Sequence, residues 1–247
     1  MIRKQATWLL ALLAACALQA RAEDAAADAT AQAVVNPKVV EKLTQMGNYL
    51  RSLSRFEVKA AITHDTVLET GQKLQIQGTS TLQVVGRDRF HAVAETDTLS
   101  REFFYNGTVF TQYSPDLHYY TTVNAPPKLT DMLHEIEDHY GIQVPMEDLF
   151  LFGTDQSQAK ALTSAMYIGP SHINGKLCDH LAFRQEGIDW QLWITRSDKP
   201  LPCKLVITTT DDTSFPEYSA LYTWNLKPGV KATRSPSSRA RKMCSFL

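Results

Sequence analysis

The sequence contains no stretch of about 20 consecutive apolar residues, the length that a membrane-spanning helix needs. We therefore do not expect an integral membrane protein. The sequence also lacks an excess of basic residues, because 25 Lys and Arg stand against 26 Asp and Glu and leave a net charge of −1. This balance argues against a dedicated nucleic-acid-binding protein, which needs a basic surface for phosphate contacts.

Motifs that carry chemistry are missing as well. The sequence has no nucleophile elbow, no glycine-rich phosphate loop and no Cys-x-x-Cys pair. His134 and Glu135 with His139 resemble the zinc-protease motif, but that motif needs its histidines four residues apart on one helical face, and here the spacing is five. We therefore expect no enzymatic activity, no catalytic residues, no cofactor and no metal site.

The sequence does contain a segment typical of export. Two basic residues at 3–4 precede an apolar run at 6–15, and an Ala-Arg-Ala sequence at 20–22 has the small-x-small pattern of a cleavage site. These features predict a signal peptide at residues 1–22. The mature protein is then expected outside the cytoplasm.

A second form of processing is also possible at this end of the chain. The sequence Leu-Ala-Ala-Cys at 13–16 fits a bacterial lipobox, in which Cys16 would be acylated and become the new N-terminus. This alternative predicts an outer-membrane lipoprotein. In both cases the Ala-rich stretch at 23–35 has no apolar periodicity and is expected to be a flexible leader.

Hydrophobic periodicity divides the next part of the chain into a helix and a set of strands. Asn36 and Pro37 fit an N-cap and a first helical position, and apolar residues recur at helical spacing from 39 to 53. Alternating apolar residues from position 56 onward predict strands, joined by turns such as Asn106-Gly107. The expected strands lie at about 56–62, 74–84, 88–96, 100–105, 109–114 and 118–123.

A helical insertion is expected to interrupt this antiparallel meander. Apolar residues from 129 to 140 form one stripe, and a second short helix is expected at 146–152. A second meander is expected in strands at about 164–169, 176–185, 188–196, 202–210 and 218–226. The pattern predicts an α+β domain at 36–226 with a strongly curved antiparallel sheet, followed by a basic, disordered tail at 227–247.

Two tryptophans indicate how this sheet is covered. Trp190 and Trp193 are three residues apart in one predicted strand, so their side chains point to opposite faces of the sheet. One face can form a core. The helices at 129–152 are expected to cover the other face.

The few cysteines give conflicting indications. Processing leaves three thiols, Cys178, Cys203 and Cys244, and an oxidising compartment favours a bond between the first two. In the predicted register, however, both Cys178 and Cys203 fall opposite Thr195, one on each side of a strand and about 9–10 Å apart. A disulfide spans only about 4.4–6.8 Å between Cα atoms, so we predict no Cys178–Cys203 bond.

Several segments of the sequence also carry a pattern of their own: REFFYNG at 101–107, APP at 125–127, CDHLAFR at 178–184, DWQLWI at 189–194 and PLPCKLVIT at 200–208. These segments resemble a bacterial family of predicted periplasmic proteins of unknown function. That family is similar in pattern to the outer-membrane lipoprotein carrier and receptor proteins (LolA/LolB-like). The resemblance implies a periplasmic half-barrel, an incomplete β-barrel around an apolar cavity with a helical lid that suits acyl chains.

The expected function is therefore that of a binding protein for lipids or lipoprotein acyl chains. A membrane receptor or envelope protein is a possible partner. The alternative is a structural or regulatory module of the cell envelope that binds a protein partner through the same curved sheet. The residues expected to line the cavity are Leu74, Ile76, Met132, Leu133, Ile136, Leu149, Phe150, Phe183, Trp190 and Leu192.

Overall fold

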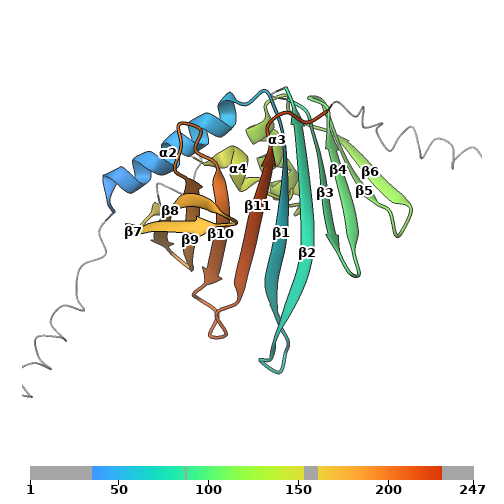
Figure 1. The fold of residues 1–247 in the computed structure, drawn as a ribbon. Helices are drawn as coiled ribbons and strands as arrows, with labels where there is room; N and C mark the ends of the chain where they lie inside the picture. The colour runs from blue at the N-terminus through green and yellow to red at the C-terminus, as the bar shows by residue number, and fades with distance from the viewer. Residues whose placement is uncertain (1–34, 87, 153–160, 230–247) are drawn as a thin grey trace, which may run out of the picture. The chain divides into compact units, whose positions relative to one another are not determined.

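The computed structural model describes residues 35–86, 88–152 and 161–229, and its strands form one antiparallel sheet (Figure 1). The first meander consists of β1 (Arg55–Val67), β2 (Lys73–Val85), β3 (Phe90–Thr96), β4 (Ser100–Tyr105), β5 (Val109–Ser114) and β6 (Tyr119–Asn124). The second consists of β7 (Ser164–Ile173), β8 (Lys176–Gln185), β9 (Ile188–Thr195), β10 (Pro202–Thr209) and β11 (Glu217–Asn225). The antiparallel sheet and its two meanders are as predicted.

The two meanders meet in the middle of the sheet. The strand order is β6-β5-β4-β3-β2-β1-β11-β10-β9-β8-β7, so the first and last strands are neighbours. Val58 of β1 lies opposite Trp224 of β11, and Ala60 lies opposite Tyr222. Strands β6 and β7 are left as edges, and the twisted, curved sheet is not closed (Figure 1).

In the described part of the chain, three helices accompany the sheet: α2 (Pro37–Ser52), α3 (Leu129–Tyr140) and α4 (Asp148–Leu151). The side chain of Asn36 caps α2 by accepting a hydrogen bond from the backbone N–H of Lys38 at 3.0 Å, as its position before a proline predicts. None of the helices among the described residues is long and apolar enough to cross a membrane.

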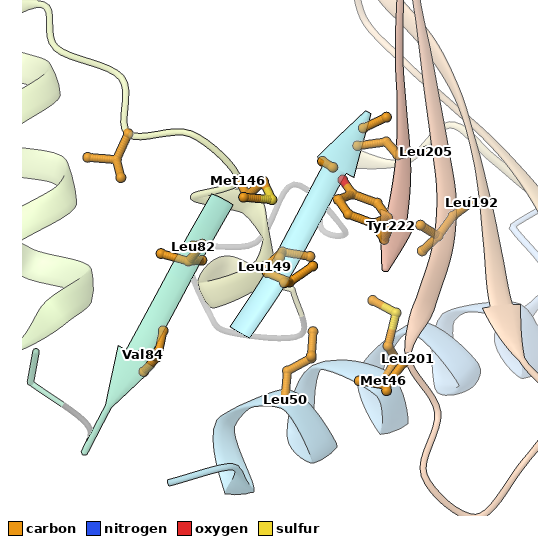
Figure 2. Packing of buried hydrophobic residues seen from close by; sticks show 14 of the residues in the cluster. Met46, Leu50, Leu82, Val84, Met146, Leu149, Leu192, Leu201, Leu205 and Tyr222 are labelled. Carbon is orange, nitrogen blue, oxygen red and sulfur yellow. The ribbon is translucent and has the colours of Figure 1, made fainter. Parts of the chain in front are cut away.

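All three helices pack on the same face of the sheet, which we call the inner face. Buried side chains of the helices join one apolar cluster with alternate residues of the strands. Figure 2 shows Leu149 of α4 among Leu82 of β2, Tyr222 of β11 and Leu50 of α2. The expectation that the helices cover the face opposite to the core is therefore wrong. The helices and the strand residues of the inner face together form the core.

The opposite, outer face carries a smaller apolar cluster around Trp193. Cys178, Cys203 and Val206 complete its buried members. The ring of His180 stacks on the indole at a centroid distance of 4.0 Å. Trp190 points to the inner face, so the predicted separation of the two tryptophans is confirmed.

Cys178 and Cys203 form a disulfide bond, and the prediction that they do not is wrong. The prediction was correct that Cys178 pairs with Thr195 and that β9 lies between the two cysteine strands. However, the register of β10 shifts between Pro202 and Lys204, which takes Cys203 out of the regular pairing. Such a bulge bends the strand and increases its twist, and the two Cα atoms are 7.1 Å apart.

Helix α2 is attached to the sheet by ionic contacts at Asp179 of β8. Lys42 Nζ lies 2.7 Å from one carboxylate oxygen, and Arg196 Nε lies 2.9 Å from the other. The hydroxyl of Tyr167 donates a hydrogen bond to the same carboxylate at 2.9 Å. Burial alone would raise the pKa of Asp179, but these hydrogen bonds and positive charges outweigh it and lower the pKa.

Candidate functional site

A half-open cavity of about 580 Å³ lies between the inner face of the sheet and the segment that includes α3 and α4. Pockets for small ligands commonly measure about 300–1,000 Å³, so this cavity is large enough to hold one. Its wall on the sheet side comes from β1, β9, β10 and β11. The opposite wall comes from α2, α3, α4 and the segment that joins the last two, and the residues on this side are Leu43, His134, Glu137, Gln143, Val144, Pro145, Met146, Glu147, Asp148, Leu151 and Phe152.

The sheet side of the cavity is almost entirely apolar. Ile207 of β10 lies between its cross-strand neighbours Trp190 and Tyr218, so three cavity residues form one row across the sheet. Trp190 is held in place by Phe183, whose ring stacks on the indole at 3.9 Å. The other residues of this wall are Ile62, Ile188 and Leu205.

Carboxyl groups are concentrated on the opposite wall. Burial raises the pKa of Glu147 to about 7, although its carboxylate accepts a hydrogen bond from the backbone N–H of Val144 at 3.2 Å. Burial and the negative charge of Glu137 also raise the pKa of Asp148. Burial and the charge of Asp148 raise the pKa of Tyr218 to about 12. The carboxyl groups therefore lie close enough together to disfavour each other's ionisation.

The residues predicted to line the cavity are distributed over three environments. Trp190 lies in the cavity wall. Phe150 is half-buried and packs against the core, while Ile76 is half-buried and Leu74 is 40% exposed on β2. The remaining predicted residues are buried in the core and do not line the cavity: Met132, Leu133, Ile136, Leu149, Phe183 and Leu192.

The sequence analysis did not predict the acidic wall. It also did not predict that Ile207 and Tyr218 line the cavity. The alternation of side chains along the strands could have indicated the second point, because residues that alternate with outward-facing ones must point inward. The sequence predicted a helix at 146–152 that covers the sheet, but it did not show that Glu147 and Asp148 would face the cavity. Their position depends on how the loop folds back.

The residues described by the structure include no group of three or more His, Cys, Asp or Glu side chains that could hold a metal ion. In particular, His139 is exposed at the end of α3, whereas His134 lines the cavity. The cavity therefore offers apolar contact along one side and carboxyl groups on the other.

Comparison with known proteins assigns this architecture to a family. A family model described as Predicted periplasmic protein (DUF2092) matches residues 40–237. The chain belongs to this family. The resemblance expected from the sequence and the periplasmic location are thereby confirmed. Acylation at Cys16, the signal peptide, the leader up to residue 34 and all but the first three residues of the tail fall outside the described residues and stay predictions.

Solved structures are similar to the chain at low sequence identity, and the first of those named here shares its fold. Lipoprotein LppX from Mycobacterium tuberculosis is 12% identical, with 79% of this chain and 100% of that chain covered and a TM-score of 0.51. LprF from Mycobacterium bovis is 13% identical over 81% of this chain and 99% of that chain, with a TM-score of 0.49. A putative outer membrane lipoprotein-sorting protein domain from Vibrio parahaemolyticus is 8% identical over 78% of this chain and 94% of that chain, with a TM-score of 0.36. No curated protein matches the chain.

Proposed function

We propose that this protein is a non-enzymatic periplasmic binding protein that holds the acyl chain of a lipid or lipoprotein in the inner-face cavity. The observation that carries the proposal is the combination of volume and lining. The cavity measures about 580 Å³, and its sheet wall consists of Ile, Leu, Trp and Tyr side chains. A flexible alkyl chain is the ligand that such a wall complements best.

The energetics of burial support this choice. Each buried methylene contributes about 0.8 kcal/mol, so ten methylenes contribute roughly 8 kcal/mol before the costs of ordering the chain are subtracted. No catalytic step is needed for a carrier. The half-open form of the cavity also allows a chain to enter without unfolding the sheet.

A cavity-filling variant tests the proposal. Ile207→Trp places a larger side chain between Trp190 and Tyr218, which reduces the space available to an acyl chain. Thr208→Trp is the matched control, because residue 208 is the next residue of β10 and its side chain points to the outer face. The probe is a fluorescent fatty-acyl methyl ester, which has a neutral polar end.

We expect the wild type and Thr208→Trp to bind the ester, and Ile207→Trp to bind it at least tenfold more weakly. Both variants should unfold cooperatively, as measured by circular dichroism. A wild-type protein that does not bind the ester contradicts the proposal. Equal binding by both variants would place the acyl chain elsewhere on the molecule.

A protein-binding role is the second candidate, and edge strand β7 favours it. Met166 is 50% exposed and Ile168 is 53% exposed on this strand, and Tyr167 between them is also exposed. The backbone N–H of Asn36 already donates to the carbonyl of Ala165 at the start of this edge. Beyond that point, an edge with exposed apolar side chains can pair with a strand of another protein. Charged substitutions at Met166 and Ile168 should abolish capture of such a partner while leaving ester binding unchanged.

A further inference from the structure

The polar end of the ligand can be specified from the carboxyl groups of the cavity. Glu137, Glu147 and Asp148 all line the wall opposite the sheet. No Lys or Arg is found among the described lining residues. We propose that the cavity takes an amphiphile whose polar end carries an ammonium group, and that it discriminates against a free fatty acid. This inference rests on the proposed acyl-binding function and goes on to name the class of headgroup.

Geometry places the acidic groups where a headgroup would lie. The apolar row of Trp190, Ile207 and Tyr218 belongs to the sheet, whereas Glu147 and Asp148 come from the segment that faces it. Tyr218 stands at one end of this row, and Asp148 lies near enough for its charge to raise the pKa of the Tyr218 hydroxyl. An alkyl chain lying along the row would therefore bring its polar end toward these carboxyl groups. A cation there would gain charge-assisted hydrogen bonds, and a carboxylate would be repelled.

Among the described residues, Glu147 and Asp148 have little compensation for a negative charge, whereas Glu137 is exposed and accepts a hydrogen bond from the side-chain amide of Gln143 at 3.2 Å. No ion pair or side-chain hydrogen bond joins the carboxyl of Asp148 to another described residue, and Glu147 receives only the backbone N–H of Val144. Burial and mutual repulsion raise the pKa of both groups. A bound ammonium group would supply the missing positive charge and favour the ionised forms.

A further polar group in the same wall is unsatisfied. His134 lies one turn before Glu137 on α3 and lines the cavity. Its Nε2 atom is buried and has no hydrogen-bond partner among the described residues. Buried polar atoms normally have a partner, so this nitrogen is available to a polar ligand atom that enters the cavity.

Competition between matched amphiphiles tests the inference. Dodecylammonium and dodecanoate share one alkyl chain and differ in the charge of the polar end. Each is added below its micelle concentration to protein loaded with the neutral acyl ester, at pH about 8, where the amine is protonated and the fatty acid is ionised. We expect dodecylammonium to displace the ester at a concentration at least tenfold lower than dodecanoate.

Two double variants assign the discrimination to the cavity. Glu147→Gln with Asp148→Asn removes two carboxyl groups from the wall, and should reduce the preference for dodecylammonium to less than threefold. Glu135→Gln with Asp138→Asn changes the net charge equally on residues of α3 that do not line the cavity, and should keep the preference. Amides are similar in size to the carboxyl groups, and a cooperative thermal transition checks that each variant is folded.

The possible results separate the two proposals. If the ester binds and both amphiphiles displace it equally, the headgroup inference is wrong and the acyl-binding function stands. If the ester binds and the preference persists in the Glu147 and Asp148 double variant, the inference is also wrong, because other groups then set the preference. If the wild type binds no ester, the proposed function itself fails.

Discussion

At the scale of single residues, Glu147 combines burial with an ionisable group. Burial raises its pKa from an ordinary value of 4.5 to about 7. Between these values the folded protein retains a proton that the unfolded chain has released. Stability therefore falls as pH rises from about 4.5 to about 7 and is level above that range. The contribution of Asp179 to stability depends on pH in the opposite direction. Its pKa is lowered in the folded protein, so this contribution is lost only as the pH falls into the acid range.

The variant Glu147→Gln should remove this part of the pH dependence. We expect the difference in unfolding free energy between variant and wild type to increase by about 1–2 kcal/mol from pH about 5 to about 8, after allowance for solvent screening. Urea denaturation at a series of pH values measures it. A difference that stays constant over that range would show that Glu147 ionises normally in the folded protein.

The disulfide makes a second prediction at this scale. Cys178 and Cys203 are separated by 25 residues, and closing a loop of that length in the unfolded chain stabilises the fold by about 3.5 kcal/mol in the chain-entropy model. The double substitution Cys178→Ala and Cys203→Ala should therefore unfold at lower denaturant concentration. Wild-type protein treated with a reducing agent should also unfold at a lower denaturant concentration. A peptide map without reduction that shows both thiols free would contradict the bond.

At the scale of the elements, the periodicity of apolar residues was sufficient to predict most of the helices and strands. The bounds of α2 and of the strands lie close to the predicted ones, because each element buries one face and its period appears in the sequence. The pairing of β1 with β11 could not be predicted from the sequence, because these strands are far apart in the chain and no local pattern indicates their contact. The bulge at Cys203 is likewise a tertiary feature, and it reversed the disulfide prediction.

Helix α3 shows how the distinction between lid and core is decided. Met132, Leu133 and Ile136 are buried in the main cluster, so one face of the helix belongs to the core. A carboxylate introduced there would be buried without a partner, at a cost of several kcal/mol against a total stability of about 5–15. We therefore expect α3 to stay packed on the sheet when a ligand enters the cavity.

We therefore expect Leu133→Glu to destabilise the fold by several kcal/mol and to abolish cooperative unfolding near room temperature. His139→Glu is the control, because it adds a carboxylate on the same helix at an exposed position. Thermal denaturation followed by circular dichroism compares the two. A Leu133→Glu protein that unfolds cooperatively but no longer takes up the acyl ester would instead make α3 a lid.

At the scale of the whole molecule, the cavity depends on four separate parts of the chain, one of which is α2 with Leu43. The first meander contributes Ile62, the second contributes Trp190 and Ile207, and the helical insertion contributes the carboxyl groups. The sequence predicted a curved sheet covered by helices, and the family resemblance implied an apolar space between them. It could not predict which side chains fill the core and which leave space, because that depends on packing between elements.

Native mass spectrometry of protein isolated from the periplasm tests export and ligand binding together. We expect a polypeptide that begins at residue 23 and carries an adduct of lipid mass, which dissociates under collisional activation. The mass of a polypeptide that begins at acylated Cys16 would make the protein a membrane-tethered binding protein, and the mass of one that begins at Met1 would contradict export.

The same measurement on two variants tests where the adduct binds. Ile207→Trp should lose the adduct and Thr208→Trp should retain it, because only the former side chain enters the cavity. Wild-type protein without any adduct, copurifying instead with a protein bound along β7, would favour the partner-binding role.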